Sequence, residues 1–266
     1  MTDIMNHDEI KFLLGSFEWS FSRINSYKTC RRMFYMQYVQ HPKLKGDDNF
    51  FSEFGIFNHT IFQKYYENEL EFFELSDYYK ENYYNVVKHQ APPNRYVNLN
   101  TKYYDTGENY WNTFEGLFDE YEILGVEEKF KIKIDNYDLT GFIDLVLRNE
   151  DGIVIVDHKS HSKFKSKKEK AEYLIQLYLY SIYIYEKYGE YPKRLIFNMF
   201  RIPEIIVEEF DMNKLEESKL WVKTTIEQIY NDEKFMCNTA KEMAFFCNNI
   251  CGMRSYCKCS DNYLGE

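Results

Sequence analysis

Long apolar runs and proline are both scarce in this chain of 266 residues. No run approaches the roughly 18 uninterrupted apolar residues of a membrane-spanning helix, so we expect no membrane segment. The opening residues MTDIMNHDEI are polar and acidic. We therefore expect no signal peptide and a location inside the cell, in the cytoplasm. The five prolines mark no linker, and no repeat or low-complexity tract divides the chain, so we expect a single domain over 1–266.

Positive charge is also in deficit. Lys and Arg total 33 against 43 Asp and Glu, and the net charge of −10 argues against a general nucleic-acid coat while allowing a local basic track. The P-loop pattern G-x-x-x-x-G-K-[ST] is absent, which excludes a fused motor of that type. Aromatic residues, in contrast, make up 19% of the chain, which supplies large apolar groups for a folded core.

Hydrophobic periodicity predicts helices in the first part of the chain and a sheet in the second. The predicted helices cover 26–38, 54–90 and 107–123, with Pro92 and Pro93 in a loop. The predicted strands cover 126–134, 137–148, 152–160, 194–200 and 204–210, with helices over 169–188 and 213–231. This order indicates an α/β fold with a mixed sheet flanked by helices. The chain comprises a helical N-terminal region (1–125), a core (126–232) and a cysteine-rich tail (233–266).

The second and third predicted strands place two acidic residues and a lysine on one face of a hairpin. A loop at 150–151 would set Asp144 opposite Asp157, whereas a loop at 151–152 would set Asp144 opposite Lys159. In both registers the three residues share a face, because side chains repeat at every second position. Opposed like charges destabilise a sheet unless something positive lies between them, so a divalent cation is indicated. A salt-bridged hairpin without a catalytic role is the alternative.

The segments GFID and VDHK resemble motifs I and II of the PD-(D/E)XK nuclease superfamily in its D-x-K form. Within it, the chain is most similar to RecB-like and CRISPR-associated adaptation exonucleases. Gly55-x-x-x-His59 resembles their upstream histidine motif, and Gln176-x-x-x-Tyr180 resembles their third motif, one turn along a helix. SYKTCRRMFYMQY resembles the segment that carries their first cluster cysteine. The resemblance runs from about residue 20 to 257 in the right order, and it implies a restriction-endonuclease-like fold.

The resemblance also implies a metal site. His59, Asp144 and Asp157 would bind Mg²⁺ or Mn²⁺, together with the backbone carbonyl of His158. Lys159 would orient the attacking water or steady the scissile phosphate. Taken alone, His59 fits core packing better than metal binding, and the ordered set of motifs reverses that preference.

Three further positions follow from the same resemblance. Gln176 and Tyr180 would position the DNA or the water, although a helical Gln/Tyr pair is also common in cores. A first-strand acid is expected as well, and spacing alone does not separate Glu127 from Glu128, so neither is assigned.

Cysteine is concentrated in the last thirty residues. The six cysteines are Cys30, Cys237, Cys247, Cys251, Cys257 and Cys259. In a chain that is not exported, such a cluster favours metal binding over disulfides. The resemblance implies that four of them, Cys30, Cys247, Cys251 and Cys257, bind a 4Fe–4S cluster. The first tail spacing is one residue longer than in the family, so Cys259 is an alternative ligand, and Cys237 is given no role. Four thiolates also suit zinc, and unligated buried cysteines remain a third possibility.

The predicted function is that of a metal-dependent DNA exonuclease that hydrolyses phosphodiester bonds at DNA ends, with a preference for single strands. The processes implied are recombination, repair or CRISPR adaptation, with a separate helicase, recombinase or integrase as partner. Six lysines and one acid from Lys159 to Lys170 predict a basic surface segment beside the site that contacts DNA phosphates. Lys28, Arg31 and Arg32 predict a second basic patch. The alternatives are a non-catalytic DNA-binding or scaffolding subunit, a zinc-stabilised structural protein, and an endonuclease.

Overall fold

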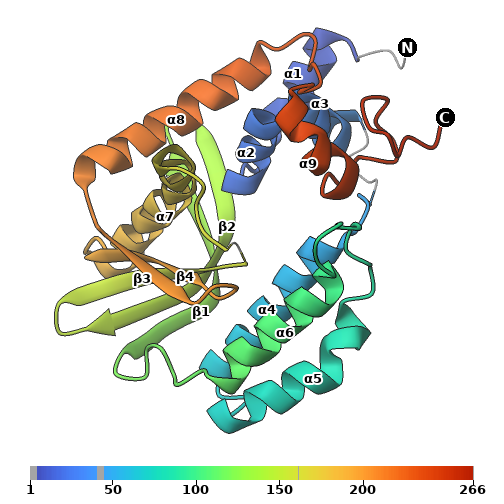
Figure 1. Cartoon of the computed structure of the whole chain (residues 1–266). Coiled ribbons are helices and arrows are strands. Elements are labelled where there is room, and N and C mark those ends of the chain that lie inside the picture. The colour runs from blue at the N-terminus through green and yellow to red at the C-terminus, as the bar shows by residue number, and fades with distance from the viewer. Residues whose placement is uncertain (1–4, 41–44, 161, 266) are drawn as a thin grey trace. The chain divides into compact units, whose positions relative to one another are not determined.

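The computed structural model describes residues 5–40, 45–160 and 162–265, and Figure 1 shows the arrangement of its elements. The α-helices are α1 (His7–Gly15), α2 (Phe21–Thr29), α3 (Arg31–Phe34), α4 (Phe50–Tyr66), α5 (Leu75–Val86), α6 (Leu99–Asn112), α7 (Lys167–Tyr188), α8 (Met212–Tyr230) and α9 (Ala244–Asn249). The π-helix η1 (Tyr35–Gln40) and the 3-10 helices η2 (Phe72–Glu74) and η3 (Lys241–Met243) accompany them. The strands are β1 (Glu122–Ile134), β2 (Tyr137–Asn149), β3 (Gly152–Lys159), β4 (Arg194–Met199) and β5 (Glu204–Glu209).

The five strands form one sheet in the order β1-β2-β3-β4-β5. β2 and β3 are antiparallel, β3 and β4 are parallel, and β4 and β5 are antiparallel. Parallel neighbours need a crossover, and α7 supplies it between β3 and β4. This helix begins after Ser166, whose hydroxyl accepts from the backbone N–H of Glu169, and it ends at Gly189 with a φ of 77°. The predicted mixed α/β sheet is therefore confirmed.

The register of the β2–β3 hairpin decides which site residues meet. Asn149 pairs with Gly152 and Leu145 pairs with Val156, so the loop is the two-residue one at 150–151. Extending the same register by one pair sets Asp144 opposite Asp157. The first of the two predicted registers is therefore correct.

The chain packs into two compact units. One comprises Met1–Asn49, Lys131–Thr140 and Lys219–Glu266, and the other comprises Phe50–Phe130 and Gly141–Ser218. Neither unit is a continuous stretch of chain, because β1, β2 and α8 each contribute residues to both. The single domain over 1–266 stays a prediction.

Within the second unit, α4, α5 and α6 pack their buried aromatic side chains against one face of the sheet. The strand side of this core is formed by Leu145, Leu147, Val154, Val156 and Ile196. The alternation of side chains puts Asp144 and Asp157 on the opposite face. α7 lies on that face, where its Tyr180 ring contacts Phe130 of β1 at a centroid distance of 5.2 Å.

Within the first unit, aromatic residues join the N-terminal helices to the chain that follows α8. The rings of Tyr27, Phe34 and Tyr35 all pack around Phe235. The hydroxyl of Tyr27 also donates to Asp232 at 2.9 Å. Residues about two hundred positions apart therefore share one core in this unit.

The helix predicted over 107–123 is wrong. α6 spans Leu99–Asn112 and begins six residues after Pro93, where the Asn98 side chain accepts from the backbone N–H groups of Asn100 and Thr101. The region after it turns at Gly116, whose φ of 73° is left-handed, and β1 has begun by Glu122. The cap at Asn98 outweighs the later run of helix-forming residues.

The continuous helix predicted over 26–38 is interrupted at Cys30. This residue is extended, with φ −158° and ψ 113°, so α2 ends before it and α3 begins after it. The break turns the Cys30 thiol towards the tail, where it accepts from the backbone N–H of Asn238 at 3.4 Å. Among the helices that the structure describes, none is long and apolar enough to cross a membrane.

Candidate active site

Asp144 and Asp157 meet where β2 and β3 run side by side. The Asp144 carboxylate accepts from the backbone N–H of His158 at 2.7 Å, which ties it to β3. Asp157 is 2% exposed, and its Oδ2 atom lies 2.8 Å from the ammonium nitrogen of Lys159. The hairpin therefore gathers the three predicted residues on one face, as both registers required.

Lys159 is held from the side of α7. Its Nζ atom donates to the amide oxygen of Gln176 at 3.1 Å and lies 5.1 Å from the centre of the Tyr173 ring. The amide nitrogen of Gln176 in turn donates to the hydroxyl of Tyr180. The structure thus brings the predicted Gln176 and Tyr180 to the lysine, in a chain of contacts that fixes the position of its charge.

His59 reaches the same carboxylates from α4. Its Nδ1 atom lies 3.5 Å from Asp144 Oδ2 and 3.9 Å from Glu127 Oε1. One turn earlier, a Cβ added to Gly55 would meet Ser160 at 3.6 Å, an ordinary contact. The glycine of this motif is therefore not required by close packing, whereas the histidine faces the site directly.

Glu127 is the residue that the spacing of the sequence left unassigned. One potential ligand atom from each of His59, Glu127 and Asp144 lies within 4.8 Å of the others. Glu128 points elsewhere, to the hydroxyl of Tyr183 at 2.7 Å. Glu127 has a φ of 44°, which breaks the regular alternation of β1 and turns its side chain to the site.

Burial of several carboxylates in one place changes their protonation. Burial, and then the charge of Asp157, raises the pKa of Asp144 to about 7, against the opposing effect of His59. Burial lowers the pKa of His59, but the charges of Asp144, Glu127 and Asp157 outweigh it and raise the value to about 9. Without a further cation the site therefore retains protons.

The side chain of His158 lies on the other face of β3 from Asp157. Its ring stacks on Phe62 at 3.8 Å, and Nδ1 lies 3.0 Å from the amide nitrogen of Asn198. Burial holds the pKa of this imidazole well below its ordinary value, so the ring is neutral. The ring is a core group, and the metal-binding role of the backbone carbonyl of this residue stays a prediction.

Comparison with known proteins identifies the family of this chain. A family model described as the PD-(D/E)XK nuclease superfamily matches residues 18–258. This chain belongs to the PD-(D/E)XK nuclease superfamily. The solved structure of a Eubacterium rectale protein named "Putative exonuclease" is 14% identical and has a TM-score of 0.50, with 87% of this chain and 86% of that chain covered. A second solved structure, SSO0001, is 12% identical with a TM-score of 0.35 and covers 86% of this chain and 95% of its own. No curated protein matches this chain.

The donor set of this PD-(D/E)XK site fits a hard divalent cation. Carboxylate oxygens are the ligands that Mg²⁺ and Mn²⁺ prefer, and one imidazole is compatible with Mn²⁺. His59, Glu127 and Asp144 are close enough together to share one ion, and Asp157 lies opposite Asp144. A cation would also offset the crowding of negative charge that raises the pKa of Asp144.

The cysteines form a second cluster, in the unit that contains the tail. The four predicted ligands Cys30, Cys247, Cys251 and Cys257 carry free thiols and line one small pocket. Burial raises the pKa of Cys251 to about 12, and the neighbouring thiols add to the effect. Four free thiols that line one pocket are a donor set that suits a soft metal or an iron–sulfur cluster.

The remaining two cysteines correct the sequence analysis. Cys237 and Cys259 form a disulfide, although the sequence argued against disulfides. This bond occupies Cys259, the alternative ligand, and gives Cys237 a partner. The Sγ atoms of both lie within 4.8 Å of the thiol of Cys257, so the disulfide borders the four-thiol pocket.

Proposed function

We propose that this protein is a metal-dependent DNA exonuclease that hydrolyses phosphodiester bonds at DNA ends, with a preference for single strands. The observation that supports it is the convergence of His59, Glu127 and Asp144 on one point, beside the Lys159–Asp157 pair. A scaffolding subunit would need no such set. A bound Mg²⁺ or Mn²⁺ would supply a Lewis acid and lower the pKa of an attacking water.

The protein residues would divide the remaining work. Asp144, Asp157, Glu127 and His59 would hold the cation, together with the backbone carbonyl of His158. The ammonium of Lys159 stabilises the charge that develops on the scissile phosphate or orients the water. Gln176 and Tyr180 keep that ammonium in place, because the three groups are linked by hydrogen bonds.

Exposed lysines next to the site support a DNA substrate. Lys163, Lys165, Lys167 and Lys168 follow the end of β3 and are exposed, although Lys168 lies 3.9 Å from Glu172. They can follow a phosphate backbone on a protein that is acidic overall. The RecB-like or CRISPR-adaptation type, a helicase, recombinase or integrase partner, and action in the cytoplasm are parts of the same proposal and rest on the ordered motifs.

The proposed second cofactor is a 4Fe–4S cluster on Cys30, Cys247, Cys251 and Cys257. The support is that these four thiols line one pocket and are free. Zinc is the alternative occupant, since four thiolates also bind it. The iron and sulfide content of anaerobically purified protein, and its colour, separate the two.

The test of the nuclease uses end-labelled linear single-stranded DNA with Mn²⁺ and protein purified without oxygen. Lys159→Ala should lower the rate of shortening by about 10²- to 10³-fold, because one preorganised charge is lost at the transition state. Lys102→Ala, which removes an exposed lysine of α6, should keep the wild-type rate.

Three other outcomes would contradict parts of this proposal. Binding without shortening by the wild type would favour the scaffolding subunit. Equal shortening by wild type and Lys159→Ala would show that Lys159 lies outside the machinery or that another nuclease contaminates the sample. Cutting of closed circular DNA would show an endonuclease.

A further inference from the structure

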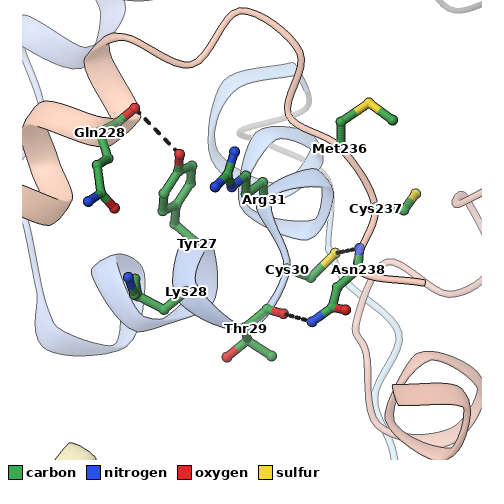
Figure 2. A pocket seen from close by; sticks show the side chains of 9 residues that line it. All are labelled: Tyr27, Lys28, Thr29, Cys30, Arg31, Gln228, Met236, Cys237 and Asn238. Atoms are coloured by element: carbon green, nitrogen blue, oxygen red, sulfur yellow. Dashed lines mark hydrogen bonds between the residues drawn. The ribbon is translucent and has the colours of Figure 1, made fainter. Parts of the chain in front are cut away.

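A pocket of about 290 Å³ lies in the unit that carries the cysteines and shares no residue with the carboxylate site. It is lined by Tyr27, Lys28, Thr29, Cys30, Arg31, Gln228, Met236, Cys237 and Asn238, all drawn in Figure 2. One wall is the junction of α2 and α3. The other is the end of α8 and the segment after it.

Hydrogen bonds hold the two walls together. The side-chain amide of Asn238 donates to the carbonyl of Thr29 at 3.0 Å, and its backbone N–H donates to the thiol of Cys30 at 3.4 Å (Figure 2). The hydroxyl oxygen of Tyr27, whose single proton is donated to Asp232, lies 3.4 Å from the carbonyl oxygen of Gln228. The pocket is therefore formed before any ligand arrives, which lowers the entropic cost of binding.

The lining carries positive charge and no acidic side chain. Among the residues that the structure describes, no carboxylate pairs with Lys28, whose side chain is exposed. Arg31 approaches Asp232 at 3.5 Å, but that carboxylate also accepts from the hydroxyl of Tyr27 and from the backbone N–H groups of Lys234 and Phe235. Asp232 is thus largely satisfied without Arg31, which leaves further guanidinium N–H groups for a ligand.

We propose that this pocket binds a phosphate of the DNA strand, as a contact separate from the carboxylate site. An ammonium and a guanidinium on one wall of a preformed cavity match an anion with several oxygens. On a protein of net charge −10, a cationic pocket with no carboxylate in its lining, beside which Asp232 is already hydrogen-bonded, is a place where a polyanion meets less repulsion. The inference rests on the proposed function, because it takes DNA as the ligand.

The test measures binding of a fluorescent single-stranded oligonucleotide by anisotropy, in EDTA to prevent cleavage, over a series of salt concentrations. The logarithm of the association constant falls linearly with the logarithm of the salt concentration. On single strands, each phosphate contact that is lost makes the magnitude of this slope smaller by about 0.7. Lys28→Ala should therefore lower the slope by about 0.7, and Lys28→Ala/Arg31→Gln by about 1.4. Over a fourfold rise in salt, the wild type should lose about seven times more affinity than the double variant.

The matched control is Lys11→Ala/Lys241→Ala, which removes the same charge from exposed positions of the same unit. It should keep the wild-type slope. Lys28→Ala leaves the Arg31–Asp232 contact intact, so its result does not depend on that contact for folding. If both pocket variants have the same slope as the control, the inference is overturned. Cleavage by the wild type would still support the proposed function in that case. If the wild type neither binds nor cuts DNA, the proposed function itself fails.

A free nucleotide is the other source of the same phosphate chemistry. Titration with dTMP separates it from the strand. Binding of dTMP that disappears in the double variant, together with an unchanged oligonucleotide slope, would assign the pocket to a nucleotide and overturn its assignment to DNA.

Discussion

At the scale of single residues, the site depends on a local break in strand geometry. Regular alternation groups Glu128 with Phe130, on the face towards α7, and no glycine or proline stands at the break itself. Glu128 keeps that face and contacts Tyr183 of α7, whereas the left-handed φ of Glu127 brings its carboxylate to His59 and Asp144. Asp144, Asp157 and Lys159 were predictable because they lie on regular strands, whereas Glu127 was not, because its position depends on a conformation that its residue type does not favour.

The two neighbouring glutamates make a matched pair for mutation. Glu127→Gln should weaken Mn²⁺ binding by at least about tenfold and lower cleavage at limiting metal, because a charged ligand is lost. Glu128→Gln, which touches Tyr183 instead, should keep the wild-type affinity. Isothermal titration with Mn²⁺ checks both, and equal effects of the two changes would contradict the assignment of Glu127.

The raised pKa values of Asp144 and His59 predict how stability depends on pH. In metal-free protein the folded state holds these protons more tightly than the unfolded state, so stability should fall as pH rises between about 4 and 9. The Asp144 contribution is lost as pH rises towards its folded pKa of about 7, and that of His59 as pH rises through about 9.

Bound metal should stabilise the folded protein more at high pH than at low pH, because a cation competes with these protons. The rise in Tm on adding Mg²⁺ should be larger at pH 8.5 than at pH 5.5, values that lie on either side of the Asp144 pKa of about 7. Thermal scans with and without Mg²⁺ measure it. In the Asp144→Asn variant, most of the difference between the rises in Tm at the two pH values should disappear. A rise in Tm that does not depend on pH in the wild type would show that these groups are not the ligands.

At the scale of elements, the sequence predicts strands better than helix ends. The hairpin of β2 and β3 follows from alternation and a two-residue loop, both of which are local. The bounds of α6 and the break between α2 and α3 depend instead on one cap, at Asn98, and one extended residue, Cys30. Cys30 faces residues about two hundred positions later, so its conformation reflects tertiary structure that periodicity does not report.

α4 connects the aromatic core to the site, and Phe62 is its central side chain. It is 1% exposed and packs on both His158 and Trp111. Phe62→Ala should lower the free energy of unfolding by about 3–5 kcal/mol, because it leaves a cavity. Phe73→Ala, at a residue 67% exposed in η2, should change it by less than about 0.5 kcal/mol. Urea denaturation checks both, and similar values would contradict the described packing.

At the scale of the whole molecule, the cysteine cluster joins the two ends of the described chain. In protein that carries the proposed 4Fe–4S cluster, Cys251→Ser should remove most of the iron and lower the Tm by at least about 5 °C, since a loss of about 2 kcal/mol shifts the Tm by roughly 4–8 °C in a protein of this size. Cys237→Ser breaks only the disulfide and should retain the iron. Iron assay and thermal scans measure these effects, and iron lost equally from both variants would contradict the four-ligand assignment.

The distance along the chain between Cys30 and the other three cysteines of the pocket also determines when each of them is synthesised. Cys30 leaves the ribosome well before Cys247, Cys251 and Cys257 exist, and at about 5–20 residues per second the wait is roughly 10–40 s. During that interval the α2–α3 junction lacks the partners that bury its thiol. The second unit, in contrast, has all its residues once Ser218 is made. The nascent chain should therefore form its carboxylate site first and its cysteine cluster last. A reducing environment during translation protects the thiol of Cys30 until the other three cysteines are made.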